Sequence, residues 1–101
     1  MSQDDDRFTI TTAQVGGTTV VRPRGAIDLA TAQQFRAELD ACSGAVVLDL
    51  AGVTFLDSSG LHAILATHRR LNDTGSFVLR DPQSNVRRAI KVVGIEHLLE
   101  E

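Results

Sequence analysis

The sequence has no tryptophan and no tyrosine, and phenylalanine occurs only four times in 101 residues. Single-stranded nucleic acid stacks its bases on aromatic side chains, so a site of that kind is poorly supplied here. The 10 Lys and Arg side chains are outnumbered by 13 Asp and Glu, which leaves a net charge of −3. This balance argues against a general polyanion binder, and we expect no direct contact with nucleic acid.

Cysteine and long apolar runs are equally scarce. The one cysteine, Cys42, excludes an intramolecular disulfide and fits a reducing compartment. We interpret it as a small buried side chain, because no local feature predicts a reactive thiol. No apolar run approaches the length of a membrane span, and the acidic N-terminus lacks the basic and apolar regions of a signal peptide. We therefore expect a cytoplasmic protein without a membrane partner.

Motifs for cofactors, metals and covalent catalysis are missing as well. There is no Walker A loop, the only lysine is Lys91, and no Gly-x-Ser-x-Gly elbow is present. His62 and His68 are separated by about 240° around a helix, so they do not share a face as metal ligands would. Asp49 has no acidic pair near it in the sequence, and we interpret it as a strand-end carboxylate that faces solvent or caps a loop. No cofactor and no metal site are expected.

The first half of the chain has the patterns of strands. Residues 8–12 alternate apolar and hydroxyl side chains, and residues 18–22 are rich in β-branched side chains. Gly16-Gly17 between them suits a tight turn, which predicts a hairpin. Pro23 cannot donate to a ladder and so marks a strand end or an edge. Residues 25–28 are expected to form a turn or a very short strand.

Helical and strand patterns then alternate. Thr31 and Gln34 have the spacing of a capping box for a helix that buries Phe35 and Leu39 beside Ala32 and ends at Gly44. Residues 45–50 are a nearly continuous apolar run, typical of a central strand, and a helical crossover would make its pairing parallel.

The second half continues this alternation. Leu61, Ile64, Leu65, His68 and Leu71 follow a helical spacing, and residues 76–80 form another strand. Ser84 or Asn85 is expected to cap a last helix. The residues that should point inward from this helix are Val86, Ala89, Ile90 and Val93. Residues 95–99 either add a short strand or pack as a tail.

The predicted order of elements is β-β-α-β-α-β-α. It indicates an α/β fold, with a single mixed β-sheet and helices packed against it. We expect residues 1–7 to be a flexible N-terminal tail and residues 8–101 to form one domain.

The turn Asp57-Ser58-Ser59-Gly60 is the most informative stretch, because it opens directly into the strongest amphipathic helix. A helix mouth has unpaired N–H groups and the positive end of the macrodipole, so a phosphate on either serine would find a favourable place. Gly60 costs helix propensity, which suggests that something approaches the backbone closely.

Simpler interpretations of these residues stay open. Asp57, Ser58 and Ser59 are all good helix caps, and the residues alone do not separate one serine from the other. A serine nucleophile would need a base and an oxyanion site, and nothing in the sequence places them. A basic cluster further along is a solvated face by default, with contact to an acidic partner as the alternative. It consists of Arg80, Arg87, Arg88 and Lys91.

Residues 53–61, Val-Thr-Phe-Leu-Asp-Ser-Ser-Gly-Leu, resemble the signature of bacterial anti-sigma factor antagonists, the STAS domains. The resemblance covers nearly the whole chain. It includes residues 25–28 with the following helix, the strand at 46–50, and the late segment 86–95. A STAS-like fold is therefore implied.

The resemblance also implies a mechanism called partner switching. The unphosphorylated protein would bind an anti-sigma factor that is also a serine kinase, which releases the sigma factor. Phosphorylation of Ser58 would end this binding, and a separate serine phosphatase would restore it. The implied partner-binding residues are Asp28, Asp57, Ser58, Ser59, Gly60 and His62. The protein would be a monomer or weak dimer and no enzyme.

Two positions depart from the family pattern. Ala26 stands where an acidic residue is common, and His62 stands where a small residue is usual. Other functions within the family, such as a stress-signalling scaffold or an interaction subunit of a lipid transporter, are the alternative hypothesis. Relatives with those functions often lack the acceptor serine.

Overall fold

The computed structural model describes residues 7–100. Apart from Arg7, the tail predicted for residues 1–7 therefore lies outside the described residues. The elements, in chain order, are β1 (Thr9–Val15), β2 (Thr18–Ile27), α1 (Ala32–Asp40), β3 (Ala45–Asp49), β4 (Val53–Leu56), α2 (Ser58–Leu71), β5 (Ser76–Arg80), α3 (Ser84–Val92) and the short 3-10 helix η2 (Glu96–Leu98). None of the described helices is long and apolar enough to cross a membrane.

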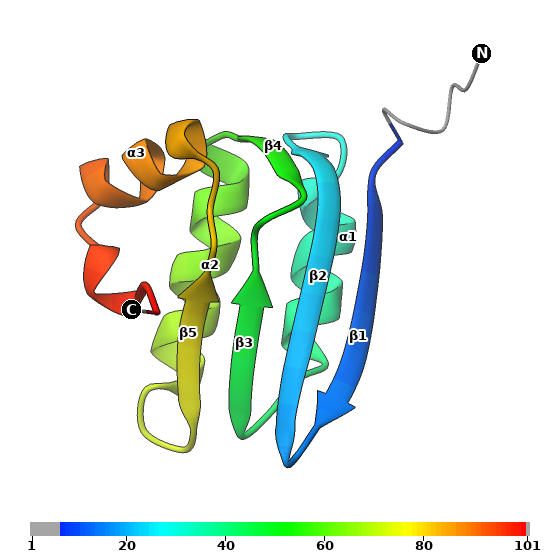
Figure 1. Ribbon diagram of the computed structural model, residues 1–101, viewed down its shortest axis with the longest axis vertical. Coiled ribbons are helices and arrows are strands. Elements are labelled where there is room, and N and C mark those ends of the chain that lie inside the picture. The colour runs from blue at the N-terminus through cyan, green and yellow to red at the C-terminus, as the bar shows by residue number, and fades with distance from the viewer. Residues whose placement is uncertain (1–6, 101) are drawn as a thin grey trace.

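One mixed sheet organises these elements, with the order β1-β2-β3-β5 and β4 beside the far end of β2 (Figure 1). The predicted hairpin is confirmed, since β1 pairs antiparallel with β2 and both Gly16 and Gly17 have positive φ. The predicted parallel pairing of residues 45–50 is confirmed too, because β3 runs parallel to β2 and β5. The α/β class with a single mixed sheet is therefore correct.

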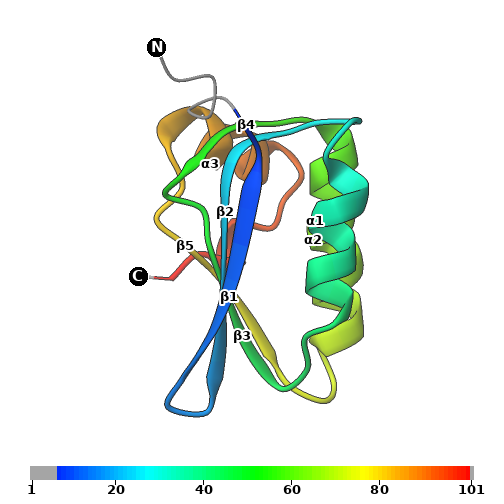
Figure 2. The same cartoon turned by 90° about the vertical axis from the view of Figure 1, so that its right-hand side faces the viewer.

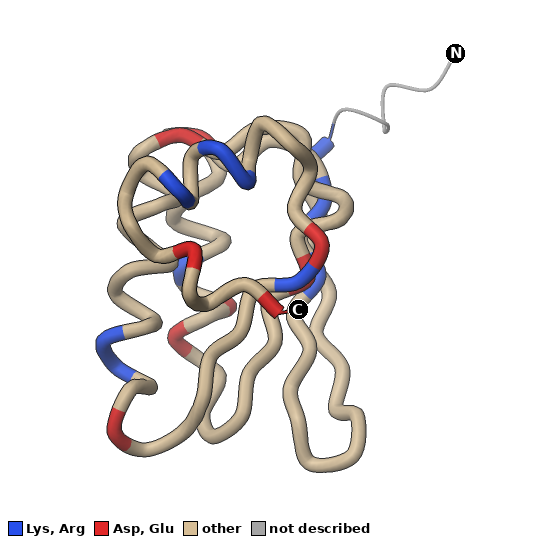
Figure 3. Tube along the Cα trace, turned by 60° about the vertical axis from the view of Figure 1, so that its left-hand side comes forward, with Lys and Arg blue, Asp and Glu red and all other residues tan. Residues whose placement is uncertain are grey.

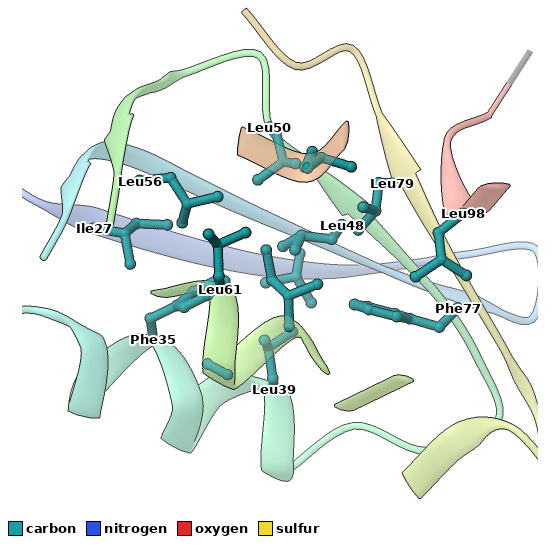
Figure 4. Packing of buried hydrophobic residues seen from close by; sticks show 14 of the residues in the cluster. Ile27, Phe35, Leu39, Leu48, Leu50, Leu56, Leu61, Phe77, Leu79 and Leu98 are labelled. Atoms are coloured by element: carbon teal, nitrogen blue, oxygen red, sulfur yellow. The ribbon is translucent and has the colours of Figure 1, made fainter. Parts of the chain in front are cut away.

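Helices α1 and α2 lie side by side on one face of the sheet, as Figure 2 shows from the edge. Phe35 and Leu39 of α1 and Ile64 of α2 are fully buried between the helices and the strands. Figure 4 shows side chains from both helices and from the strands meeting in this layer. The helix α3 packs near β4 and η2, and it buries Val86 and Ile90. Val93, expected to point inward, is 39% exposed.

The strand β2 is longer than predicted. It continues through Pro23 to Ile27, so a turn or short separate strand at residues 25–28 is wrong. The pairing of β2 with β3 ends at Val21, and its pairing with β4 begins at Gly25. Pro23 thus occupies a local edge between two partners, where the missing N–H is tolerated.

The predicted N-cap position of α1 is correct but its capping bond is absent, and the predicted cap of α3 is wrong. Thr31 is the N-cap of α1, but its side chain makes no capping bond. Its hydroxyl instead accepts from the N–H of Asp28 at 3.0 Å and donates to the carbonyl of Ala26 at 2.8 Å. At α3 the N-cap is Gln83, and Asn85 donates to the carbonyl of Thr54 at 2.9 Å. Thr31 therefore bonds the loop before α1 to β2, and Asn85 bonds the first turn of α3 to β4.

Arg70 of α2 donates hydrogen bonds to the C-terminus of α1, a contact that the sequence did not predict. Its guanidinium donates to the carbonyl of Leu39 at 2.7 Å and to that of Cys42 at 2.8 Å, at the C-terminus of α1. Carbonyls in the last turn of a helix have no intrahelical donor, and they carry the negative end of its dipole. Arg70 therefore joins the two helices on this face of the sheet.

We predict that Arg70→Ala lowers the free energy of unfolding by about 1–2 kcal/mol, because two hydrogen bonds from a charged donor are lost. Urea denaturation followed by circular dichroism measures this. Arg69→Ala is the matched control, since it removes the same charge from an exposed neighbour that has no hydrogen bond or ion pair among residues 7–100. Equal effects of the two substitutions would show that the Arg70 contacts contribute nothing.

Candidate functional site

The turn that begins α2 is positioned by the pairing of β4 with β2. The two strands run parallel from Gly25 opposite Val53 to Ile27 opposite Leu56. One further bond, from the N–H of Asp57 to the carbonyl of Ile27 at 3.1 Å, continues this ladder into the turn. The turn at residues 57–60 and the loop at residues 28–31 therefore leave the sheet next to each other. This brings together the two segments that the family resemblance implies to share one surface.

Asp57 is the N-cap of α2. Its Oδ1 accepts from the N–H of Ser59 at 2.9 Å, from the N–H of Gly60 at 3.2 Å, and from the hydroxyl of Ser59. The hydrogen bond from the Ser59 hydroxyl holds the pKa of the Asp57 carboxyl below its usual value. Hydrogen bonds from the N–H groups of Gly60, Ser59 and Leu29 lower this pKa further. The carboxylate is therefore charged at neutral pH and completes the start of the helix.

The structure distinguishes the two serines, which the sequence alone did not. The hydroxyl of Ser59 is committed to Asp57, and its side chain is partly buried. Ser58 is exposed, and no hydrogen bond of its hydroxyl is found within residues 7–100. Ser58 can therefore be modified without breaking the cap, whereas modification of Ser59 would remove one of its bonds.

The expectation of free N–H groups for a phosphate needs correction for two of these groups. The N–H groups of Ser59 and Gly60 are already bonded to Asp57. A phosphate on Ser58 would thus add negative charge beside the ionised carboxylate of Asp57, which already accepts from two N–H groups of the first turn. The main effect of such a phosphate would be a change in the charge of the surface.

Gly60 is explained by packing inside the domain. A Cβ at this position would lie 2.7 Å from Cγ2 of Ile27, and closer still to a methyl group of Leu56. Gly60 itself is buried, so the close approach inferred from the sequence is that of the first turn of α2 to the sheet. Contact of Gly60 with a partner stays a prediction.

The loop before α1 adds an apolar side chain to this region. Asp28 shapes the loop, since its Oδ1 accepts from the N–H of Ala30 at 3.0 Å and lies 3.3 Å from the hydroxyl of Thr31. Leu29 is 84% exposed, and its N–H reaches the carboxyl of Asp57. Sequence reasoning missed Leu29, because one leucine in a short loop has no periodic pattern to mark it.

His62 is exposed and lies four residues after Ser58, so the two side chains share one face of α2. His68 instead meets His97 of η2, with 5.8 Å between ring centroids. No group of three metal-ligating side chains is found in the described part of the chain. His62 is therefore a surface residue, and His68 and His97 form a contact between α2 and η2.

The other candidate residues have structural roles. Asp49 accepts from the N–H of Ala51 at 3.0 Å and pairs with Arg22, as expected of a loop cap. Cys42 is buried, and burial, with a further contribution from the carboxylate of Glu38, raises the pKa of its thiol. The predicted burial of Cys42 is confirmed, and its lack of reactivity stays a prediction.

The basic cluster is smaller than the sequence suggested. Arg80 forms an ion pair with Glu100 at 2.8 Å, so its charge is not available to a partner in the way the other three charges are. The three cations of α3, at positions 87, 88 and 91, are exposed and form no ion pair within residues 7–100. Figure 3 marks where Lys and Arg lie along the chain.

Comparison with known proteins identifies the family. Residues 9–100 match the STAS domain. The chain belongs to this family. This STAS domain is 32% identical over 95 residues to the anti-sigma-F factor antagonist RsfB of Mycobacterium tuberculosis, an alignment that covers 90% of the chain and 78% of RsfB.

Solved structures agree with this assignment. A crystal structure of an anti-sigma factor antagonist from Mycobacterium paratuberculosis has a TM-score of 0.85 and 30% identity, covering 93% of this chain and 84% of the other. The anti-sigma factor antagonist SpoIIAA in its unphosphorylated form has a TM-score of 0.79 at 24% identity, covering 91% and 86%. The STAS-like fold expected from the sequence is confirmed.

We predict that Gly60→Ala destabilises the domain by about 1–2 kcal/mol, although alanine is the better helix former, because the added methyl overpacks against Ile27. Thermal unfolding measures the change. Ser58→Ala, in the same turn but exposed, is the control and should leave the melting temperature nearly unchanged. A Gly60→Ala variant as stable as the control would contradict the packing argument.

Proposed function

We propose that this STAS domain is an anti-sigma factor antagonist whose binding to its anti-sigma factor is ended by phosphorylation of Ser58. In its unphosphorylated form it binds the anti-sigma factor and so releases the sigma factor. The anti-sigma factor acts as the serine kinase, and a separate serine phosphatase reverses the modification. The domain itself is a ligand and a substrate, and it catalyses no reaction.

The exposed, uncommitted hydroxyl of Ser58 carries this proposal. A kinase must reach the acceptor hydroxyl, and Ser58 offers it on the surface, while Ser59 is held by Asp57. The two relatives at 30% identity or more, RsfB and the protein from Mycobacterium paratuberculosis, are anti-sigma factor antagonists, which supports the choice of partner.

The docking surface in this proposal consists of Asp28, Leu29, Asp57, Ser58, Ser59, Gly60 and His62. Leu29 supplies apolar contact, and the exposed edge of the turn supplies polar contact. A phosphate adds a charge of about −1.5 to −2 in the middle of this surface. Desolvation of that charge and its repulsion by Asp57 and by acidic partner groups would oppose binding.

We predict that the kinase transfers phosphate from Mg-ATP to Ser58 and not to Ser59. Mass spectrometry of the treated protein locates the phosphate. Ser58→Ala should abolish the transfer and retain binding, whereas Ser58→Asp should weaken binding at least about tenfold, or roughly 1.4 kcal/mol. Ser59→Ala is the control and should still be phosphorylated. Phosphate on neither serine, with a kinase that is active on another substrate, would overturn the switch.

We also predict that Leu29→Ala weakens binding of the unphosphorylated protein to its anti-sigma factor about tenfold, because an exposed apolar side chain loses its buried contact in the complex. Isothermal titration calorimetry measures the affinity. Val92→Ala is the matched control, since Val92 is 79% exposed on α3, outside the docking surface. Equal losses at both positions would mean that Leu29 lies outside the interface.

A further inference from the structure

The two edge strands of the sheet, β5 and β1, differ in whether another segment of the chain covers them. At β5 the chain covers its own edge, because Leu99 forms a bridge with Leu79 and the N–H of Glu100 donates to the carbonyl of Leu79 at 2.7 Å. The ion pair of Arg80 with Glu100 holds this segment in place. At β1 the only strand partner in the described part of the chain is β2. Figure 2 looks onto this edge, and no helix lies in front of it.

The open edge of β1 lacks the features that usually protect edge strands. The strand pairs with β2 in unbroken register from Thr9 to Val15, so no bulge twists its outer edge away. No charged residue and no proline occurs from Phe8 to Val21. Every side chain of β1 except that of Ile10 is exposed. Such a regular, uncharged edge presents N–H and C=O groups to another strand.

We propose that β1 pairs antiparallel with β1 of a second copy of this chain, about a two-fold axis through Thr12. The two sheets then form one continuous sheet across the dimer. In this register Thr11 lies opposite Ala13, and Thr9 lies opposite Val15. Residues that face each other come from the same side of each sheet, so the partly buried Ile10 stays on the side covered by the helices.

Self-complementarity favours a second copy over a different protein. A two-fold interface brings each residue against its symmetry partner, so a charged strand would oppose itself, and this strand is uncharged. The nearest preceding cation, Arg7, would fall opposite Gly17 and meet no like charge. The β-branched pairs between threonine and valine are favourable across strands. Because pairing of two edges buries little area, we expect a weak and reversible dimer.

Cysteine cross-linking tests the register. Opposing Cα atoms in an antiparallel pair are about 4.5–5.5 Å apart, within disulfide range, so Thr12→Cys should form a covalent dimer on mild oxidation. Gln14→Cys is the matched control, because the two copies of position 14 would be about 13 Å apart along the strands. Both variants carry Cys42→Ala, because the native thiol lines the same cavity as Thr12 and Gln14 and could otherwise form an intramolecular disulfide with the new cysteine. Cross-linking of Gln14→Cys as fast as Thr12→Cys would overturn the register.

Sedimentation equilibrium tests the dimer without cross-linking. The unmodified protein should dimerise as its concentration approaches about 1 mM, in the range of weak interfaces. Thr11→Lys with Ala13→Lys should raise the dissociation constant at least about tenfold, since each copy would place like charges across the axis. Gln33→Lys with Gln34→Lys, on the exposed side of α1, should not. A purely monomeric protein at this concentration, or equal effects of the two double variants, would overturn the proposal. Neither measurement involves Ser58, so the result is independent of the proposed function.

Discussion

The parallel pairing of β4 with the last three residues of β2 is the constraint on which the candidate site depends. It is short, and its register shifts between Gly25 and Ala26. Its effect is nevertheless large, because the bond from Asp57 to Ile27 fixes where α2 begins. Gly60 then allows the first turn of α2 to rest directly on Ile27 and Leu56. Without this pairing, Asp57 and the loop at Leu29 would not share a surface.

The cap on α2 gives two adjacent serines different chemistry. From the residues alone they are interchangeable, but Asp57 accepts hydrogen bonds from the hydroxyl of Ser59 and from the N–H groups of Ser59 and Gly60. The fold therefore needs nothing from Ser58. A modification there changes the charge of the surface while the cap and the core keep their contacts. This arrangement is compatible with the proposed binding switch, in which the modified protein would have to remain folded for a phosphatase to act on it.

Local patterns predicted much of the fold, and contacts between distant segments account for the errors. The hairpin, the central strand and the buried face of α1 follow from alternation and helical spacing, which neighbouring residues determine. The length of β2 does not, because Pro23 is tolerated only where β3 has ended and β4 has not begun. The capping box failed since Thr31 bonds to Ala26, and Asn85 bonds to Thr54 for a similar reason. At the site, the motif indicated the turn and the resemblance implied Ser58, but the different contacts of the two serines and the exposure of Leu29 depend on the tertiary structure.

The proposed dimer contact and the proposed docking surface belong to different parts of the sheet. One is the lateral edge of β1, and the other lies where β2 and β4 end and α2 begins. Pairing of two β1 strands leaves the Ser58 turn uncovered in both copies, so one dimer would present two docking surfaces. If the anti-sigma factor is itself dimeric and its spacing matches, the second contact becomes intramolecular and gains effective concentration. Phosphorylation of a single copy would then remove that gain as well as one contact, so binding would respond to the first modification more steeply than in a monomer.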